Sequence, residues 1–305
     1  MKSLDCRFNP GACFLLSFLA PAMFLLSACA NIDAPAAASN LATLSTEQIA
    51  RIVASPDRSA ADRANDQRRK PEQMLAFIGI WPGMVALDIS AAGGYTTELL
   101  ARAVGLGGRV YGQSEPPRGP DSPPRPAVTP EGDSAPSAAP AQAAPAASVA
   151  ALPPAVRRTS AQALAERAKN PAVANIVAVV QKFEDPVPPE RAAGGLDLVT
   201  LMFNYHDLGH LGTDRAGMNN AVFAGLKRGG LYVIADHSGR PGTGISEAGT
   251  LHRIEESFLR QEIESAGFKL VKEGNFLRNP SDPRDKNTPN PPQPKDEFVL
   301  KFVKP

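Results

Sequence analysis

The chain has 305 residues, of which 43% are hydrophobic, and a formal net charge of +1. This length is sufficient for one good-sized domain with tails. The near-neutral charge gives no electrostatic reason to expect nucleic-acid binding, which favours clustered basic surface.

The first 29 residues have the features of an export signal. Lys2 and Arg7 precede an apolar run that ends in small residues, and a run of about 17–20 apolar residues is marginal for spanning a membrane. Residues 26–29 (Leu-Ser-Ala-Cys) resemble the lipobox of bacterial lipoproteins, whose cysteine is lipidated and becomes the mature N-terminus. We therefore expect a lipoprotein signal peptide at 1–29 that ends at Cys29. A retained transmembrane anchor is the alternative.

This N-terminal signal also predicts the location of the protein. Ala30, not Asp, follows the lipobox cysteine, which by resemblance to the enterobacterial sorting rule indicates the outer membrane. We expect an exported lipoprotein of the bacterial cell envelope, on the periplasmic face. All three cysteines lie at or before Cys29, so we expect neither a disulfide nor a thiolate metal site in the folded body.

Two further segments have a composition typical of unfolded chain. Residues 30–60 are rich in Ala, Ser and Asn and are predicted to be a flexible tether. Residues 114–155 are dominated by Pro and Ala and contain no aromatic side chain, so they bury too little surface to offset their ordering entropy. The predicted organisation is a domain at 61–305, interrupted by a disordered insertion at 114–155.

Strands and helices alternate along the domain. A broken helical region at 59–77 comes first, followed by a strand at 84–89, a small-residue turn and a helix at 95–104 that ends at glycines. Further strands are expected at 109–113, 174–181, 196–203, 231–236, 268–273 and 297–303, and further helices at 160–169, 214–226 and 254–266. This alternation favours a mostly parallel sheet with helices on both faces.

The turn after the first strand is the strongest local signal for a ligand. Asp88 lies near the end of the apolar strand, and the small residues Ser-Ala-Ala-Gly-Gly follow at 90–94. A strand–turn–helix unit of this kind holds nucleotide-like ligands against its backbone. The Gly-x-Gly-x-x-Gly spacing of NAD-type oxidoreductases is absent, which disfavours that class.

Taken with several later segments, this turn resembles the class I S-adenosylmethionine-dependent methyltransferases, and more narrowly a bacterial family of predicted, often exported methyltransferases. The resemblance covers about 62–304, apart from the insertion. The segments that carry it are 88–94, 196–199, 204–207, 226–230, 236–244, 250–254 and 276–280. It implies an α/β, Rossmann-like, doubly wound, seven-stranded and mostly parallel sheet with an antiparallel closing strand. It also implies S-adenosyl-L-methionine as the cofactor.

The resemblance assigns the cofactor-binding residues. In the family's Gly-x-Gly-x-Gly run, Ser90 and Ala92 replace two glycines here and Gly94 matches the third. Gln113, followed by Ser114 and Glu115, stands where the family places an acid for the ribose hydroxyls. The predicted cofactor-binding residues are Asp88, Ser90, Ala92, Gly94, Tyr95, Gln113, Glu184 and Asn204.

Three histidines follow or adjoin the later strands. Adjacent strand ends lie about 5 Å apart, so we expect His206, Asp207, His237 and His252 to be catalytic at one cleft, with His206 or His237 as the base. No His-x-His pair exists, and no metal site is expected. A divalent site formed by these histidines with Asp207 and Asp236 is the less favoured alternative.

The predicted function is therefore S-adenosylmethionine-dependent methyl transfer to an unknown small or envelope-associated acceptor. The alternative is a non-catalytic ligand-binding lipoprotein that uses the same fold, which the altered glycine run also suits. The expected partners are a small-molecule or envelope-associated substrate and the membrane, reached through the N-terminal lipid anchor.

Overall fold

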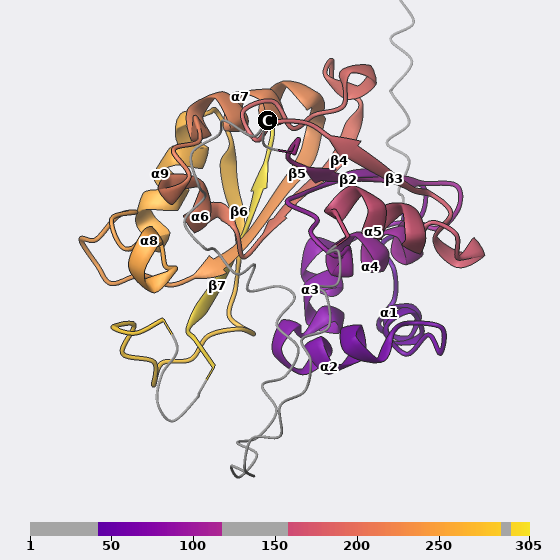
Figure 1. Ribbon diagram of the computed structural model, residues 1–305, viewed down its shortest axis with the longest axis horizontal. Helices are drawn as coiled ribbons and strands as arrows, with labels where there is room; N and C mark the ends of the chain where they lie inside the picture. The colour runs from indigo at the N-terminus through magenta and orange to yellow at the C-terminus, as the bar shows by residue number, and fades with distance from the viewer. Residues whose placement is uncertain (1–41, 118–157, 288–293) are drawn as a thin grey trace, which may run out of the picture. The chain divides into compact units, whose positions relative to one another are not determined.

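The computed structural model describes residues 42–117, 158–287 and 294–305, which form an α/β sandwich around one seven-stranded sheet (Figure 1). The signal peptide at 1–29, Cys29 and most of the 114–155 insertion lie outside these residues. Within them, no helix is long and apolar enough to cross a membrane. The strands are β1 (Val85–Ile89), β2 (Arg109–Ser114), β3 (Ile176–Val180), β4 (Leu196–Met202), β5 (Leu226–His237), β6 (Lys269–Gly274) and β7 (Glu297–Val303).

The strand order is β3-β2-β1-β4-β5-β7-β6. Strands β1 to β5 are parallel to one another, and β7 runs antiparallel to its neighbours β5 and β6. This confirms the predicted doubly wound sheet with its antiparallel closing strand. The chain moves outward from β1 to β3 on one side and restarts at β4 on the other, so the topological switch point lies between β1 and β4.

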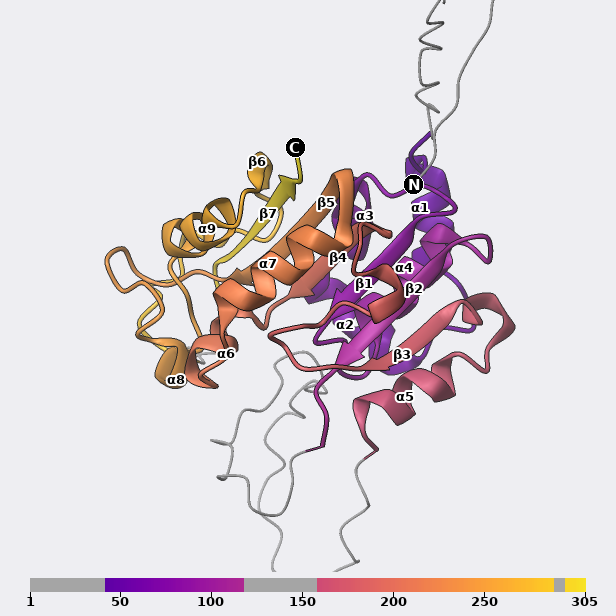
Figure 2. The same cartoon turned by 90° about the horizontal axis from the view of Figure 1, so that it is seen from above.

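Helices cover both faces of the sheet (Figure 2). Neighbouring strand residues point to opposite faces: Ala86 packs in one core and Leu87 in the other. Residues of α1 (Thr46–Val53), α3 (Pro71–Ile78), α4 (Tyr95–Val104) and α5 (Ser160–Arg167) belong to the first core, which α2 (Ala60–Arg69) adjoins. Residues of α6 (Tyr205–His210), α7 (Arg215–Gly225) and α9 (Glu256–Ser265) belong to the second, and α8 (Ala248–Leu251) contacts α6.

Helix α1 lies where a flexible tether was expected, so the second half of the 30–60 prediction is wrong. Ser45 begins the helix with a reciprocal capping box to Gln48, which satisfies backbone donors at the helix start. Ile49 is buried in the first core, and α1 contacts α3 and α4. The composition of 30–60 concealed one short amphipathic helix, and the ordered domain begins before residue 61.

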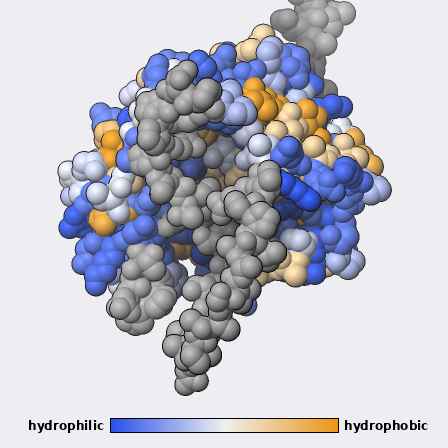
Figure 3. Space-filling view, viewed as in Figure 1, coloured by the Kyte–Doolittle hydropathy of each residue, from blue (hydrophilic) through white to orange (hydrophobic). Residues whose placement is uncertain are grey.

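Two local features also differ from the prediction. Residues 227–230, which separate the expected helix at 214–226 from the expected strand at 231–236, belong to β5, where a register shift between Leu196 and Leu198 absorbs the extra residues. Residues 205–210, for which no helix was predicted, form the short helix α6. On the face drawn in Figure 3, the coloured surface is mostly hydrophilic, with apolar residues in scattered groups.

Candidate functional site

A pocket opens at the switch point, beyond the carboxyl ends of β1, β2 and β4. Its cavity volume is about 140 Å³. Its lining residues are Ser90, Ala92, Gln113, Ser114, Glu115, Ser160, Phe183, Asn204, Asp207 and Leu211. Open α/β sheets bind ligands at this position because the loops on either side diverge there.

The β1–α4 turn keeps the backbone conformation of a glycine-rich turn although two glycines are replaced. Ser90 has φ +58°, Ala92 φ +46° and Gly94 φ +88°. The left-handed region costs a residue with a side chain roughly 1–2 kcal/mol. Gln113 holds the turn in place, because its Oε1 accepts from the Ser90 N–H at 2.9 Å and its carbonyl accepts from the Ala91 N–H at 2.9 Å.

Asp88, predicted to bind the cofactor, instead fastens the sheet to α4. Thr97 Oγ1 donates to one carboxylate oxygen at 2.6 Å, and Thr200 Oγ1 donates to the other at 2.7 Å. The side chain is 2% exposed, and it does not line the pocket. Burial raises the pKa of Asp88 to about 6, although the two hydroxyls partly oppose the shift.

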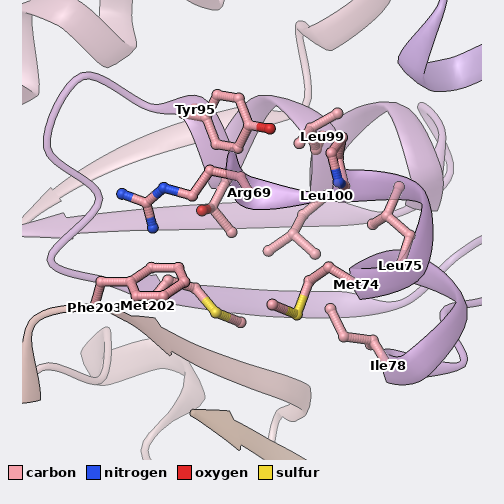
Figure 4. A pocket seen from close by; sticks show the side chains of 11 residues that line it. Arg69, Met74, Leu75, Ile78, Tyr95, Leu99, Leu100, Met202 and Phe203 are labelled. Carbon is pink, nitrogen blue, oxygen red and sulfur yellow. The ribbon is translucent and has the colours of Figure 1, made fainter. Parts of the chain in front are cut away.

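Gly94 and Tyr95, which were also predicted to bind the cofactor, do not line this pocket. A Cβ on Gly94 would lie 2.8 Å from Leu164 Cδ2, so this glycine admits α5 rather than a ligand. Tyr95 donates its hydroxyl to Asp66 Oδ1 at 2.7 Å. It lines a second, mainly apolar pocket between α3 and α4, where the Arg69 guanidinium lies 4.1 Å from the centroid of the Phe203 ring (Figure 4).

Arg167 of α5 supports the turn from behind. Its Nε donates to the Gly93 carbonyl at 2.5 Å, and its guanidinium pairs with Asp62 of α2 and Glu98 of α4. One arginine thus ties three helices to the turn. The sequence carried no signal for this contact, because Asp62 and Arg167 are 105 residues apart.

The end of β2 offers an acid two positions past the predicted Gln113. The Gln113 side chain lines the pocket, yet its Oε1 holds Ser90 and its Nε2 donates to the Gln181 carbonyl at 2.7 Å. Glu115, two residues further, also lines the pocket. After β3, the pocket is lined by the buried Phe183 and not by the predicted Glu184.

A polar cluster borders the pocket at the start of α6. Asn204 Nδ2 donates to Asp207 Oδ2 at 3.0 Å, and both residues line the pocket. His206 is 1% exposed. Its Nδ1 lies 2.6 Å from Asp236 Oδ1, and its Nε2 lies 3.2 Å from Asp207 Oδ1. Burial disfavours the imidazolium, but Asp236 and Asp207 outweigh it and raise the pKa of His206 to about 10.

The three predicted histidines do meet, although they are not equally accessible. His237 is 1% exposed, and its ring lies 5.4 Å from that of His206. His252 is half-buried, and its Nδ1 lies 3.0 Å from Asp207 Oδ1. His206 and His237 are enclosed and do not line the pocket, and their role as the base stays a prediction. His252 and Asp207 are the members that reach the surface or the pocket.

Solved structures with a similar fold include S-adenosylmethionine-dependent methyltransferases. A SAM-dependent methyltransferase from Aquifex aeolicus aligns with a TM-score of 0.50 and 14% identity, over 86% of this chain and 100% of that one. Fibrillarin from Aeropyrum pernix, solved with natively bound S-adenosyl-L-methionine, aligns with a TM-score of 0.40 and 14% identity, over 73% of this chain and 67% of that one. No protein-family model and no curated protein matches the sequence. The chain thus has the fold of the class I methyltransferases.

Replacing Asp88 should change how stability depends on pH. Its raised pKa means that the folded protein binds a proton more tightly than the unfolded chain, so stability falls as pH rises from about 4 to 6. In Asp88→Asn this loss disappears, and urea denaturation should show the variant gaining roughly 2–3 kcal/mol relative to wild type between pH 4 and 7. The exposed Asp285→Asn is the control. A stability difference that does not vary with pH would contradict this account.

Replacing Ala92 by glycine should change the stability of the folded protein very little. In Ala92→Gly, relief of about 1 kcal/mol of left-handed strain offsets the roughly 0.5–1 kcal/mol of added unfolded-chain entropy. The free energy of unfolding should therefore stay within about 0.5 kcal/mol of wild type in thermal or urea melts. Ala91→Gly, at a buried neighbour without positive φ, should lose about 1 kcal/mol or more. Equal losses in both variants would show that the Ala92 backbone is not strained.

Proposed function

We propose that this protein is an S-adenosylmethionine-dependent methyltransferase acting on a small or envelope-associated acceptor. The observation that carries the proposal is the β1–α4 turn. It keeps left-handed backbone at Ser90 and Ala92 and presents both residues to a pocket at the switch point. A strained conformation persists only where the surrounding structure enforces it, and such positions cluster at ligand sites.

The residues around the pocket fit the cofactor. Ser90 and Ala92 have small side chains, so the turn still lets a ligand approach its backbone. Glu115 is an acceptor suited to ribose hydroxyls, Phe183 offers an apolar wall for the adenine ring, and the amide of Asn204 faces the same space. The bound cofactor would supply an electrophilic methyl group on a sulfonium centre.

On the acceptor side, we assign Asp207 and His252. Asp207 lines the pocket and lies 3.0 Å from the half-buried His252 ring. A histidine oriented by a carboxylate can bind and position an acceptor that carries a proton. The enclosed His206 and His237 hold Asp207 and Asp236 in place behind them.

Binding without turnover is the second candidate function. Gln113 stands at the usual position of the acid that binds the ribose. Its side-chain amide is already hydrogen-bonded to the Ser90 N–H and the Gln181 carbonyl. A ligand-binding lipoprotein would need the pocket but not the acceptor-side pair. Calorimetry with S-adenosylmethionine, followed by an assay for methyl transfer to envelope extracts, distinguishes the two functions.

Calorimetry of the full-length protein with S-adenosylmethionine and S-adenosylhomocysteine tests the cofactor site. Glu115→Gln should weaken binding about tenfold, because loss of a charged acceptor costs about 1.4 kcal/mol. Glu184→Gln, at a residue that does not line the pocket, should bind as wild type does. If wild type binds neither compound, the methyltransferase proposal fails. If it binds them but methylates no extract, the binding protein is favoured.

We also propose that the chain is exported and attached to the envelope membrane by a lipid on Cys29, with no role in nucleic-acid binding. The support is the apolar N-terminal run that ends in Leu-Ser-Ala-Cys. Labelling of cells with a clickable fatty acid should mark the wild type and Cys13→Ser, whereas Cys29→Ser should carry no label. Label that persists on Cys29→Ser would refute the assignment.

A further inference from the structure

Three side chains converge beside the cofactor pocket with the spacing of metal ligands. The donor atoms of His206, Asp207 and His252 all lie within 4.8 Å of one another. Asp207 Oδ1 is 3.2 Å from His206 Nε2 and 3.0 Å from His252 Nδ1. Bonds of about 2.0–2.1 Å from a metal ion to nitrogen and oxygen place adjacent donor atoms roughly 3 Å apart. Two of the three separations therefore match those around a single ion.

The surroundings of these side chains aim them at one point. Asp236 lies 2.6 Å from His206 Nδ1, which leaves the opposite ring nitrogen, Nε2, directed at Asp207. Asp236 is itself fixed by the backbone N–H groups of His206 and His237, at 2.9 and 2.8 Å. Metal-binding histidines almost always donate their second ring N–H to a group such as a carboxylate, and ligating carboxylates are hydrogen-bonded in turn. Asn204 provides that second bond to Asp207.

One donor atom of the cluster is left unsatisfied. His206 Nε2 is buried and, among the described residues, has no hydrogen-bond partner, because its approach to Asp207 lacks hydrogen-bond geometry. A buried polar atom without a partner costs about 1–3 kcal/mol. A cation between the three side chains would satisfy this nitrogen and offset the charges of Asp207 and Asp236.

We propose that His206, Asp207 and His252 bind a divalent transition-metal ion. Two imidazoles with one carboxylate favour zinc, cobalt, nickel or iron over magnesium and calcium, which prefer all-oxygen sites. Three protein ligands leave coordination positions open, as in catalytic metal sites. The site goes beyond the proposed methyltransferase function and does not depend on it, because metal binding is measured without cofactor or acceptor.

Cobalt titration of the full-length protein, stripped with a chelator and dialysed, tests the site. Wild type should bind one Co²⁺ per chain with a visible absorption band, and Zn²⁺ should displace it. His252→Ala and Asp207→Asn should weaken binding at least tenfold, and Asp236→Asn should weaken it about 10–100-fold through loss of the supporting carboxylate. The matched control is His210→Ala, which removes a histidine that is not part of the cluster.

Folding of each variant is checked by circular dichroism. His252 has φ +51°, so His252→Asn, which tolerates that conformation, provides a second ligand variant should His252→Ala not fold. If the stripped wild type binds no stoichiometric Co²⁺ or Zn²⁺, or if a folded His252 variant binds as tightly as wild type, the cluster is a hydrogen-bonded ion network only. Either result overturns the proposal.

Discussion

The carboxylate of Asp88 joins the three elements that meet at the switch point. Asp88 belongs to β1, and its carboxylate accepts hydrogen bonds from the hydroxyls of Thr97 in α4 and Thr200 in β4. Register places Asp88 directly opposite Thr200, so the bond between the strands follows from the sheet. The residues that line the pocket lie at or just beyond the carboxyl ends of β1 to β4, or in and beside α5 and α6.

The turn beyond Asp88 shows how a glycine-rich motif can lose glycines and keep its shape. Its left-handed backbone is enforced from outside: Gln113 binds it from β2, and Arg167 binds the Gly93 carbonyl from α5. Because these contacts hold the backbone, Ser90 and Ala92 keep positive φ despite their Cβ atoms. The matched glycine, Gly94, remains where α5 packs too closely for a side chain.

The polar residues after β4 and β5 form a single unit. Asp236 orients His206, Asn204 orients Asp207, and Asp207 contacts His252. His206, Asp207 and His237 are all buried, but of these only Asp207 lines the pocket, and His252 is half-buried. A ligand in the pocket would therefore meet Asp207, and Asp236 and Asn204 hold His206 and Asp207 in their orientations.

The sequence by itself determined the sheet and the place of its ligand edge. Uniformly apolar strands, the helix at 95–104 and the turn at 90–94 are local patterns, and local backbone and hydrophobic preferences decide them.

Only the tertiary structure decided the direction of each side chain. Asp88, Gly94 and Tyr95 turn toward protein partners, and Glu115 faces the pocket. The cluster of His206, Asp207 and His252 brings together residues up to 46 positions apart, since 252 − 206 = 46. Such contacts depend on which distant partners the fold supplies, and spacing along the chain does not contain that information.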